Sequence, residues 1–202
     1  SITPHTLVVT STSTRNSSNP THDSNFLHFG RIQVKKPTID WFMHNISSSV
    51  STNLLLGHIL RGSAIGVSDG SYFPIEMLGS CAWILATPDG SEFIKGGGLI
   101  PGPSNSQSSY RSELGGQLGL ASFISNIMLP ATVSTKVTVA CDGLGALQQV
   151  DDNTMFASTK RKDFDLISPI KCLWHASTIA PSIKHVKGHQ DSSASTLSPL
   201  EE

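Results

Sequence analysis

The sequence predicts an α/β domain built on a mixed five-stranded sheet with flanking helices. The first half of the domain has three strand-like runs joined by short turns, whereas the second half alternates strand-like and helical runs. Strands joined by short turns pair antiparallel, and strands joined through a helix pair parallel. We therefore expect three antiparallel strands followed by parallel crossovers.

The strand predictions rest on short runs of apolar and β-branched residues. Residues 64–73 (AIGVSDGSYF) form the first run, and residues 80–102 contain two more, separated by a Pro-Asp-Gly turn at 88–90. A fourth strand is expected at 136–140 (KVTVA), where it runs into a Cys-Asp-Gly sequence. A fifth is expected within 182–189 (SIKHVKGH), leaving into a loop.

One long amphipathic helix is predicted within residues 107–128 because its apolar residues recur at helical spacing. These residues are Leu114, Leu118, Ala121 and Ile124. The same segment carries three glycines, each of which costs a helix roughly 1 kcal/mol relative to alanine. We expect Gly115, Gly116 and Gly119 to let the helix lie close against the sheet.

The ends of the helices also have sequence signals. Ser108 or Ser109 is suited to cap the long helix, because a serine hydroxyl accepts a hydrogen bond from an unpaired backbone N–H of the first turn. Shorter helices are expected at 144–150 and at 163–177, the second of them in spite of Pro169.

Composition divides the chain into three parts. Residues 1–25 are dominated by Ser, Thr and Asn and are expected to be a flexible lead. Residues 26–60 are expected to be a connecting segment with possible short helices, and residues 61–202 to be the domain. The chain starts with Ser1, which suggests a piece of a longer protein.

The net charge limits the kinds of binding partner to be expected, and the cysteine content indicates the cellular compartment. The net charge of −1 gives no general attraction for nucleic acid, so a polyanion would need a local patch or metal ions. Cys81, Cys141 and Cys172 lie among apolar residues and are expected to be buried, reduced thiols. No apolar run approaches the ~18 residues of a membrane span. We expect an intracellular protein without a membrane partner, in cytoplasm or nucleus.

Three acidic residues lie at positions that the predicted fold would bring close together. Asp69 follows Val67 on the first strand, Glu113 lies near the start of the long helix, and Asp142 ends the fourth strand. Neighbouring strand ends and a covering helix bring such side chains together. Three adjacent carboxylates repel one another and raise one another's pKa values, so we expect the cluster to bind divalent cations.

Four motifs in order resemble those of type 1 ribonuclease H, in particular the ribonuclease H domain of retroelement reverse transcriptases. They are SDGS at 68–71, YRSEL at 110–114, CDG at 141–143 and HVKGHQD at 185–191. The resemblance covers residues 61 to about 191 and implies a ribonuclease H-like fold. It also implies an endonuclease that cuts the RNA strand of RNA/DNA hybrids, linked in its parent polyprotein to a polymerase domain.

The resemblance also implies roles for individual residues. Asp69, Glu113 and Asp142 would bind Mg²⁺, with Mn²⁺ as a substitute, and His189 would assist proton transfer or product departure. Four further positions match those that contact the minor groove of the hybrid, where the 2′-hydroxyl marks the RNA strand. These substrate-binding positions are Gly70, Ser71, Ser109 and Tyr110.

The chain departs from the family in two places. The family has a fourth metal-binding aspartate on a C-terminal helix, which this sequence lacks before it ends at LSPLEE; Glu201 and Glu202 match no motif. We therefore expect weak binding of a second metal ion and weak activity.

The second departure is that the segment before Lys162 is too short for the family's basic substrate-binding handle. The basic residues at 160–162 either take its place at the phosphates of the substrate or form a solvated charge run.

Other interpretations compete with the nuclease. One is a catalytically impaired ribonuclease H-like module that binds nucleic acid or a partner without cutting. Another is a serine hydrolase, because GVSDG at 66–70 fits a nucleophile elbow with Ser68, Asp142 and His189 in triad order. An elbow turns from strand into helix, whereas β structure is expected to continue after Ser68.

Two further motifs are incomplete. One is the zinc-finger-like spacing of Cys172, His185 and His189, and the other is the Gly-x-Gly at 143–145.

Overall fold

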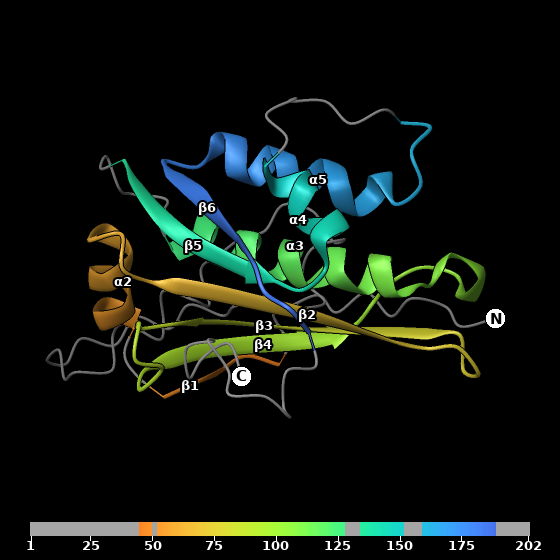
Figure 1. Ribbon diagram of the computed structural model, residues 1–202, viewed down its shortest axis with the longest axis horizontal. Coiled ribbons are helices and arrows are strands. Elements are labelled where there is room, and N and C mark those ends of the chain that lie inside the picture. The colour runs from red at the N-terminus through yellow and green to blue at the C-terminus, as the bar shows by residue number, and fades with distance from the viewer. Residues whose placement is uncertain (1–44, 50–51, 128–133, 152–158, 189–202) are drawn as a thin grey trace, which may run out of the picture. The chain divides into compact units, whose positions relative to one another are not determined.

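A mixed six-stranded sheet forms the centre of the described structure (Figure 1), a computed structural model. The structure describes residues 45–49, 52–127, 134–151 and 159–188. The strands are β1 (Ser47–Ser48), β2 (Ile65–Phe73), β3 (Leu78–Ala86), β4 (Phe93–Leu99), β5 (Thr135–Cys141) and β6 (Ile179–His185). The helices are α2 (Thr52–Leu60), α3 (Ser109–Ile127), α4 (Leu144–Asp151) and α5 (Phe164–Ala176), with a short 3-10 turn, η2 (Ser104–Ser106).

The strand order is β1-β4-β3-β2-β5-β6, and the pairing changes direction at β2. β1, β4, β3 and β2 pair antiparallel, whereas β2 with β5 and β5 with β6 pair parallel. The predicted mixed α/β arrangement, with antiparallel strands first and parallel crossovers after them, is therefore confirmed. The predicted C-terminal truncation lies outside the described residues.

One strand more than the predicted five is present. β1 pairs Ser47 with Lys95 and Ser48 with Ile94 at the outer edge of β4. Two consecutive serines carry none of the apolar alternation that identifies a strand, so the sequence did not predict β1. β6 begins at Ile179, before the predicted run, and includes Pro181. Proline is tolerated there because β6 is the last strand of the described sheet.

The predicted turn between β3 and β4 is present. The Asp89 carboxylate accepts hydrogen bonds from the Thr87 hydroxyl and from the backbone and hydroxyl of Ser91. These hydrogen bonds lower the pKa of Asp89. Gly90 has a φ of +69°, which glycine adopts without strain. The turn is therefore closed by its own side chains.

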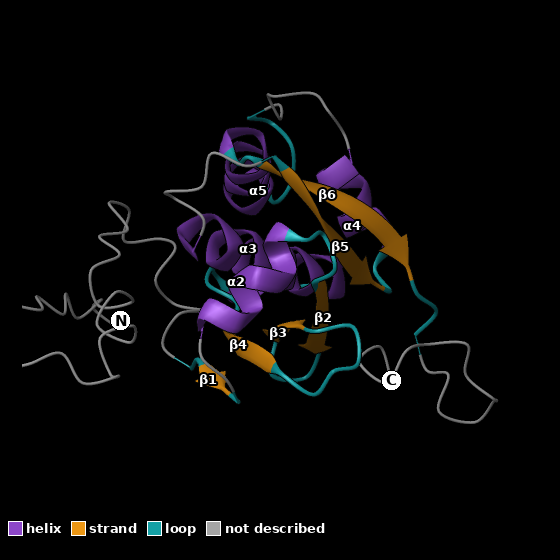
Figure 2. Cartoon of the chain, turned by 90° about the vertical axis from the view of Figure 1, so that its left-hand side faces the viewer, coloured by secondary structure: helices purple, strands orange, loops and turns teal. Residues whose placement is uncertain are grey.

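Helix α3 packs along β2 and β3, and α5 packs against α3 on the same side of the sheet (Figure 2). Ser108 caps α3 by accepting a hydrogen bond from the Arg111 N–H at 3.1 Å. All four residues of the predicted apolar stripe are buried: Leu114, Leu118, Ala121 and Ile124. Below α3, the Trp83 and Phe123 rings lie 4.7 Å apart between centroids.

Two of the helix glycines show why α3 lies so close to the sheet. A Cβ atom at Gly116 would lie 3.0 Å from the Ala82 carbonyl oxygen and from Ser68 Cβ. At Gly119 it would overlap the Trp83 ring. The expectation that these glycines permit close packing is confirmed, and the packing fixes α3 over the centre of β2.

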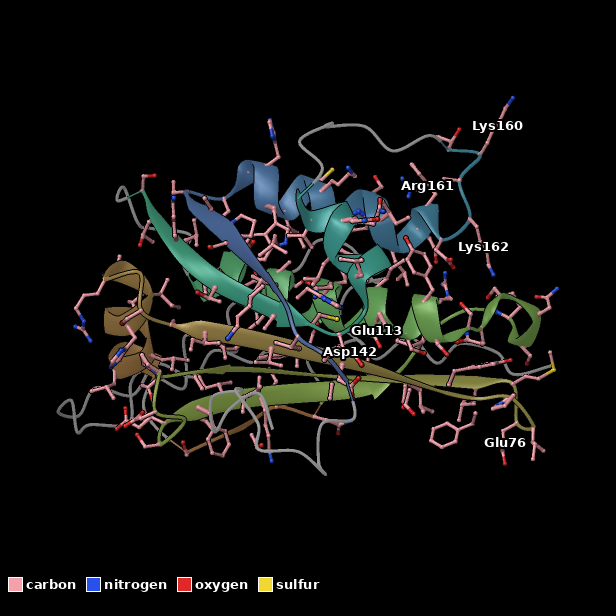
Figure 3. All side chains as sticks on the ribbon, in the orientation of Figure 1. Glu76, Glu113, Asp142, Lys160, Arg161 and Lys162 are labelled. Atoms are coloured by element: carbon pink, nitrogen blue, oxygen red, sulfur yellow. The ribbon has the colours of Figure 1, made fainter. Side chains whose placement is uncertain are left out.

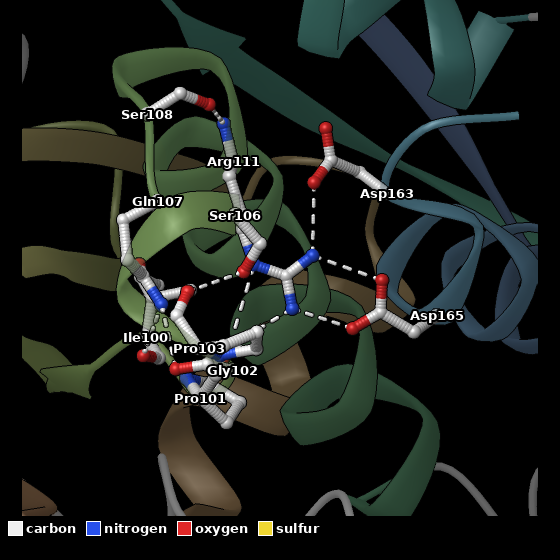
Figure 4. A network of polar contacts seen from close by, with 10 residues as sticks. All are labelled: Ile100, Pro101, Gly102, Pro103, Ser106, Gln107, Ser108, Arg111, Asp163 and Asp165. Carbon is white, nitrogen blue, oxygen red and sulfur yellow. Dashed lines mark hydrogen bonds and ion pairs between the residues drawn. The ribbon is translucent and has the colours of Figure 1, made fainter.

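A buried ion-pair network fastens the start of α3 to the start of α5 (Figure 4). The Arg111 guanidinium donates to Asp163 at 2.9 Å and to both carboxylate oxygens of Asp165. It also donates to the Pro101 carbonyl oxygen. The Arg111 and Asp163 side chains are only 4% and 1% exposed, whereas Asp165 is 61% exposed.

Within the predicted connecting segment 26–60, the described part contributes β1 and α2. Leu55 and Ile59 of α2 are fully buried. The Thr135 hydroxyl, at the start of β5, donates to the Ile59 carbonyl oxygen at 3.0 Å. Helix α2 is thereby attached to the end of the sheet where β5 begins.

The cysteine prediction is confirmed for two residues and wrong for the third. Cys81 and Cys141 are buried free thiols, but Cys172 is exposed. The buried side of α5 contains Leu166, Ile167, Ile170, Lys171 and Trp174. Cys172 falls off this stripe, although its neighbours in sequence are mostly apolar. Among the described helices, none is both long and apolar enough to cross a membrane.

Candidate active site

Strand β2 presents Ser68 and Asp69 to opposite faces of the sheet. Gly66 and Gly70 lie directly under α3, and Ser68 accepts a hydrogen bond from Gln117 of α3 at 2.8 Å. Because side chains alternate along a strand, Asp69 points to the other face. Asp69 is exposed there, and its carboxylate accepts the Gly70 N–H at 2.8 Å.

Gly70 brings β2 into contact with the backbone of α3. A Cβ atom at this position would overlap the backbone of Ser112 and Glu113. Any larger residue would therefore push α3 away from β2. The absence of a side chain at Gly70 allows Glu113 to reach the level of Asp69 along the strand.

Glu113 is the most perturbed acid of the site. Its side chain is almost buried, with the residue only 8% exposed. The pKa of Glu113 is raised to about 7, mainly by burial and to a smaller extent by the negative charges of Asp142 and Asp69, while the hydrogen bond from Cys141 opposes the shift. The expectation that clustered acids raise one another's pKa values is confirmed for Glu113.

Asp142 follows β5 immediately and completes the cluster with Glu113 (Figure 3). Its Oδ1 atom is buried and has no hydrogen-bond partner. Its backbone carbonyl oxygen accepts from His185 Nε2 at 3.1 Å, which fixes the end of β5 to the end of β6. A Cβ atom at Gly188 would overlap Asp142 Oδ2, so the chain passes against the carboxylate one residue before His189.

Glu113, Cys141 and Asp142 offer one potential ligand atom each, and these atoms lie within 4.8 Å of one another. The two carboxylates are hard oxygen donors, which suit Mg²⁺ or Mn²⁺. A buried carboxylate oxygen without a partner, as at Asp142, is costly unless a cation or a proton satisfies it. The residues present therefore fit a divalent cation, and the Asp69 charge acts on the same group.

The raised pKa of Glu113 leads to a prediction about stability without divalent cations. Glu113 ionises near 4.5 in the unfolded chain and at about 7 in the folded one, so the folded state binds more protons between these pH values. Its contribution to the free energy of unfolding is therefore present below about pH 4.5 and is lost as the pH rises through 7. We expect a loss of about 2 kcal/mol, after allowance for solvent screening.

The measurement is urea denaturation in EDTA between pH 4.5 and 8, comparing the wild type with Glu113→Gln. The wild type contains other titrating groups, so the quantity of interest is the difference between the two proteins at each pH. Glu113→Gln should become the more stable protein toward pH 8. Parallel curves across the whole range would contradict the assigned pKa shift.

The predicted substrate-binding residues lie around this cluster. Ser71 shares the exposed face of β2 with Asp69, and Ser109 is the exposed first residue of α3. Tyr110 is half-buried against Gly145, and burial raises its pKa. Tyr110 also interacts with Arg161, which places Arg161 near the start of α3. Figure 3 shows Arg161 and its neighbours Lys160 and Lys162.

His189, Glu201 and Glu202 lie outside the described residues, so their positions stay predictions. Of the competing interpretations, the serine hydrolase is contradicted by geometry. β2 continues as a strand from Ile65 to Phe73, and Ser68 is 3% exposed beneath α3. Cys172, one of the three residues with zinc-like spacing, is exposed on α5, and the His185 ring contacts the Asp142 carbonyl oxygen instead.

Sequence reasoning did not predict the contacts of three buried polar residues beneath α3, near Glu113. These residues are Ser68, Gln117 and Cys141. A signal was present for two of them. Gln117 lies four residues after Glu113, on the same face of the helix, and Ser68 alternates with Asp69 along the strand. Arg111 was missed because its partners lie 52 and 54 residues away in sequence.

Comparisons by sequence and by structure give different results. No protein-family model matches the chain, and no curated protein matches it. Among solved structures, the chain is similar to ribonuclease H1 of the halophilic archaeon Halobacterium salinarum, with 16% identity and a TM-score of 0.41 over 62% of this chain and 86% of that one. It is also similar to an N-terminal ribonuclease H domain from Mycobacterium tuberculosis, solved as a fusion with maltose binding protein, with 14% identity and a TM-score of 0.42 over 63% of this chain and 84% of that one.

Proposed function

We propose that the chain is a ribonuclease H-like, metal-dependent endonuclease that hydrolyses the RNA strand of RNA/DNA hybrids. The observation that carries the proposal is the convergence of Glu113 and Asp142, with an unpartnered buried oxygen on Asp142 and the charge of Asp69 beside them. Glu113 of α3 and Asp142 at the end of β5 lie within ligand distance of one another, and the Asp69 charge on β2 acts on Glu113. The order of the four sequence motifs supports the same assignment.

Asp69, Glu113 and Asp142 would hold the divalent cation, Mg²⁺ or Mn²⁺. When bound, the metal would activate a water molecule and stabilise the departing 3′ oxygen of the cleaved strand. The chain itself contributes the negative charge and the fixed geometry. Gly70 keeps Glu113 close to β2, and the His185 ring fixes the backbone of Asp142. His189 would assist proton transfer or product departure.

The hybrid would lie along the exposed face next to Asp69 and the start of α3. The Gly70 and Ser71 backbone, together with Ser109 and Tyr110, would contact the minor groove, where the 2′-hydroxyl distinguishes RNA from DNA. The basic residues 160–162 would contact phosphates near Tyr110. These contacts select the type of strand and not its base sequence.

The biological setting follows from the sequence resemblance. The motif pattern resembles that of retroelement reverse transcriptases, so we infer that a polymerase domain is linked to this domain in a parent polyprotein. The same setting implies an intracellular protein.

Cleavage of a labelled RNA/DNA hybrid tests the proposal. We expect cutting of the RNA strand in Mg²⁺ or Mn²⁺, loss of cutting in EDTA, and no cutting of a DNA duplex of the same sequence. Hybrid that binds to the protein but stays intact with both metals would instead support a binding module. Absence of both binding and cutting would contradict the proposed function.

A further inference from the structure

A line of buried polar side chains runs from the middle of α3 to Glu113. Gln117, Ser68 and Cys141 are 0%, 3% and 0% exposed. Gln117 Nε2 lies 2.8 Å from Ser68 Oγ, and Cys141 Sγ lies 3.1 Å from Glu113 Oε2. Ser68 and Cys141 each follow the paired residues Val67 and Ala140, so they lie side by side on the parallel strands β2 and β5. Three elements, α3, β2 and β5, thus contribute to one continuous line.

The direction of the hydrogen bonds follows from the chemistry of the two ends. The Cys141 thiol donates to the Glu113 carboxylate oxygen, which accepts. At the other end, the Gln117 amide donates to Ser68. The Ser68 hydroxyl is then free to donate to the Cys141 sulfur.

The Cys141 sulfur also accepts the Gly143 N–H at 3.2 Å. This bond ties the thiol to the turn that carries Asp142. Cys141 therefore contacts Glu113 through its proton and the Asp142 turn through its sulfur. The Cys141 sulfur and one oxygen each of Glu113 and Asp142 lie within 4.8 Å of one another.

Packing alone does not require polar groups at these positions. A valine or alanine would fill the space beneath α3 without the desolvation cost of a buried amide and hydroxyl. Glu113 and Gln117 are four residues apart on one face of α3, so the line leaves the helix, crosses two strands and returns one turn earlier. Both ends of the line are thus fixed to the same rigid element.

We propose that Cys141 and Ser68 are positioning residues that orient the Glu113 carboxylate for metal binding. Cys141 holds Oε2 directly, and Ser68, supported by Gln117, holds the thiol. The inference rests on the proposed metal-binding role of Glu113. In this role Ser68 supports the geometry of the site and does not act as a nucleophile.

The test compares Cys141→Ala, Cys141→Ser and Cys81→Ala by calorimetric titration of each protein with Mg²⁺. Loss of a group that orients a metal ligand typically weakens metal binding about 10- to 100-fold, and we expect this for Cys141→Ala. Cys141→Ser keeps a donor and should bind within about threefold of the wild type. Cys81 is the matched control, because it is a buried thiol whose hydrogen bond is made with the Gly98 backbone instead of Glu113.

A second readout does not depend on metal. The infrared S–H stretch of Cys141 should lie at the frequency of a hydrogen-bonded thiol and should shift in Glu113→Gln, which replaces the charged acceptor by a neutral one. It should also shift in Ser68→Ala. Cys141→Ala identifies the band by removing it. An S–H band at the frequency of a free thiol would overturn the proposal even if Cys141→Ala fails to fold.

The positioning role and the proposed function fail in different ways. Wild-type affinity in Cys141→Ala, or an equal loss in Cys81→Ala, would overturn the positioning role and leave the nuclease intact. A wild type that binds no Mg²⁺ but has the shifted S–H band would overturn the metal-binding function, and with it the role of the thiol in metal binding.

Discussion

Replacement of Asp142 by asparagine should lower hybrid cleavage by roughly a hundredfold to a thousandfold while the protein stays folded. The change removes a negative charge from the cation site. Its structural cost should be small, because Asp142 Oδ1 has no hydrogen-bond partner to lose. The backbone bond between the Asp142 carbonyl oxygen and His185 also remains.

Initial cleavage rates at saturating Mg²⁺ and thermal unfolding measured in EDTA together test this prediction. Glu76→Gln is the matched control, since it removes one exposed carboxylate at the tip of the β2–β3 hairpin, away from the cluster (Figure 3). It should cleave at the wild-type rate. If Asp142→Asn retains that rate as well, the assignment of the site is wrong.

Replacement of Arg111 by methionine should lower the free energy of unfolding by about 3 to 5 kcal/mol. Methionine approximates the length of the arginine stem but leaves Asp163 buried without its cationic partner. Asp163 is 1% exposed and already has one oxygen, Oδ2, without a partner. The Pro101 carbonyl oxygen also loses its donors (Figure 4). The free energy of unfolding in urea is the measurement.

The two aspartates provide a graded control for this network. Asp165→Asn alters an ion pair whose carboxylate is 61% exposed, and exposed pairs contribute only about 0 to 1 kcal/mol. Asp163→Asn acts on the buried side of the same guanidinium and should cost several times more. Equal costs for the two variants would show that burial does not determine the strength of this network.

Local sequence signals account for most of the fold. The Pro-Asp-Gly turn, the apolar stripe of α3 and the alternation of strands with helices each have a short-range cause, and each was predicted. β1 was missed because Ser47 and Ser48 carry no pattern of their own and are held by the edge of β4. β6 begins at Ile179, before the predicted run, and includes Pro181, which an edge strand tolerates.

The candidate site, too, was predicted from the sequence only in part. The positions of Asp69, Glu113 and Asp142 followed from motif order and strand ends. The contacts of these side chains are made with residues distant in sequence. Cys141 lies 28 residues from Glu113, and Gln117 lies 49 residues from Ser68. Neither pair has a local pattern, so only the assembled fold brings these residues together.

The pairing of β2 on both sides has a consequence for the order of folding. β2 pairs β3 across a hairpin, but its other neighbour, β5, pairs Ile65 with Thr138, some 70 residues later in the chain. Closing a long loop costs more entropy than closing a short one, so the hairpin meander should form before the parallel half joins. Asp69 and Glu113 belong to the early half and Asp142 to the late one. In a nascent or partly folded chain the carboxylates would remain apart, so cation binding would report completion of folding.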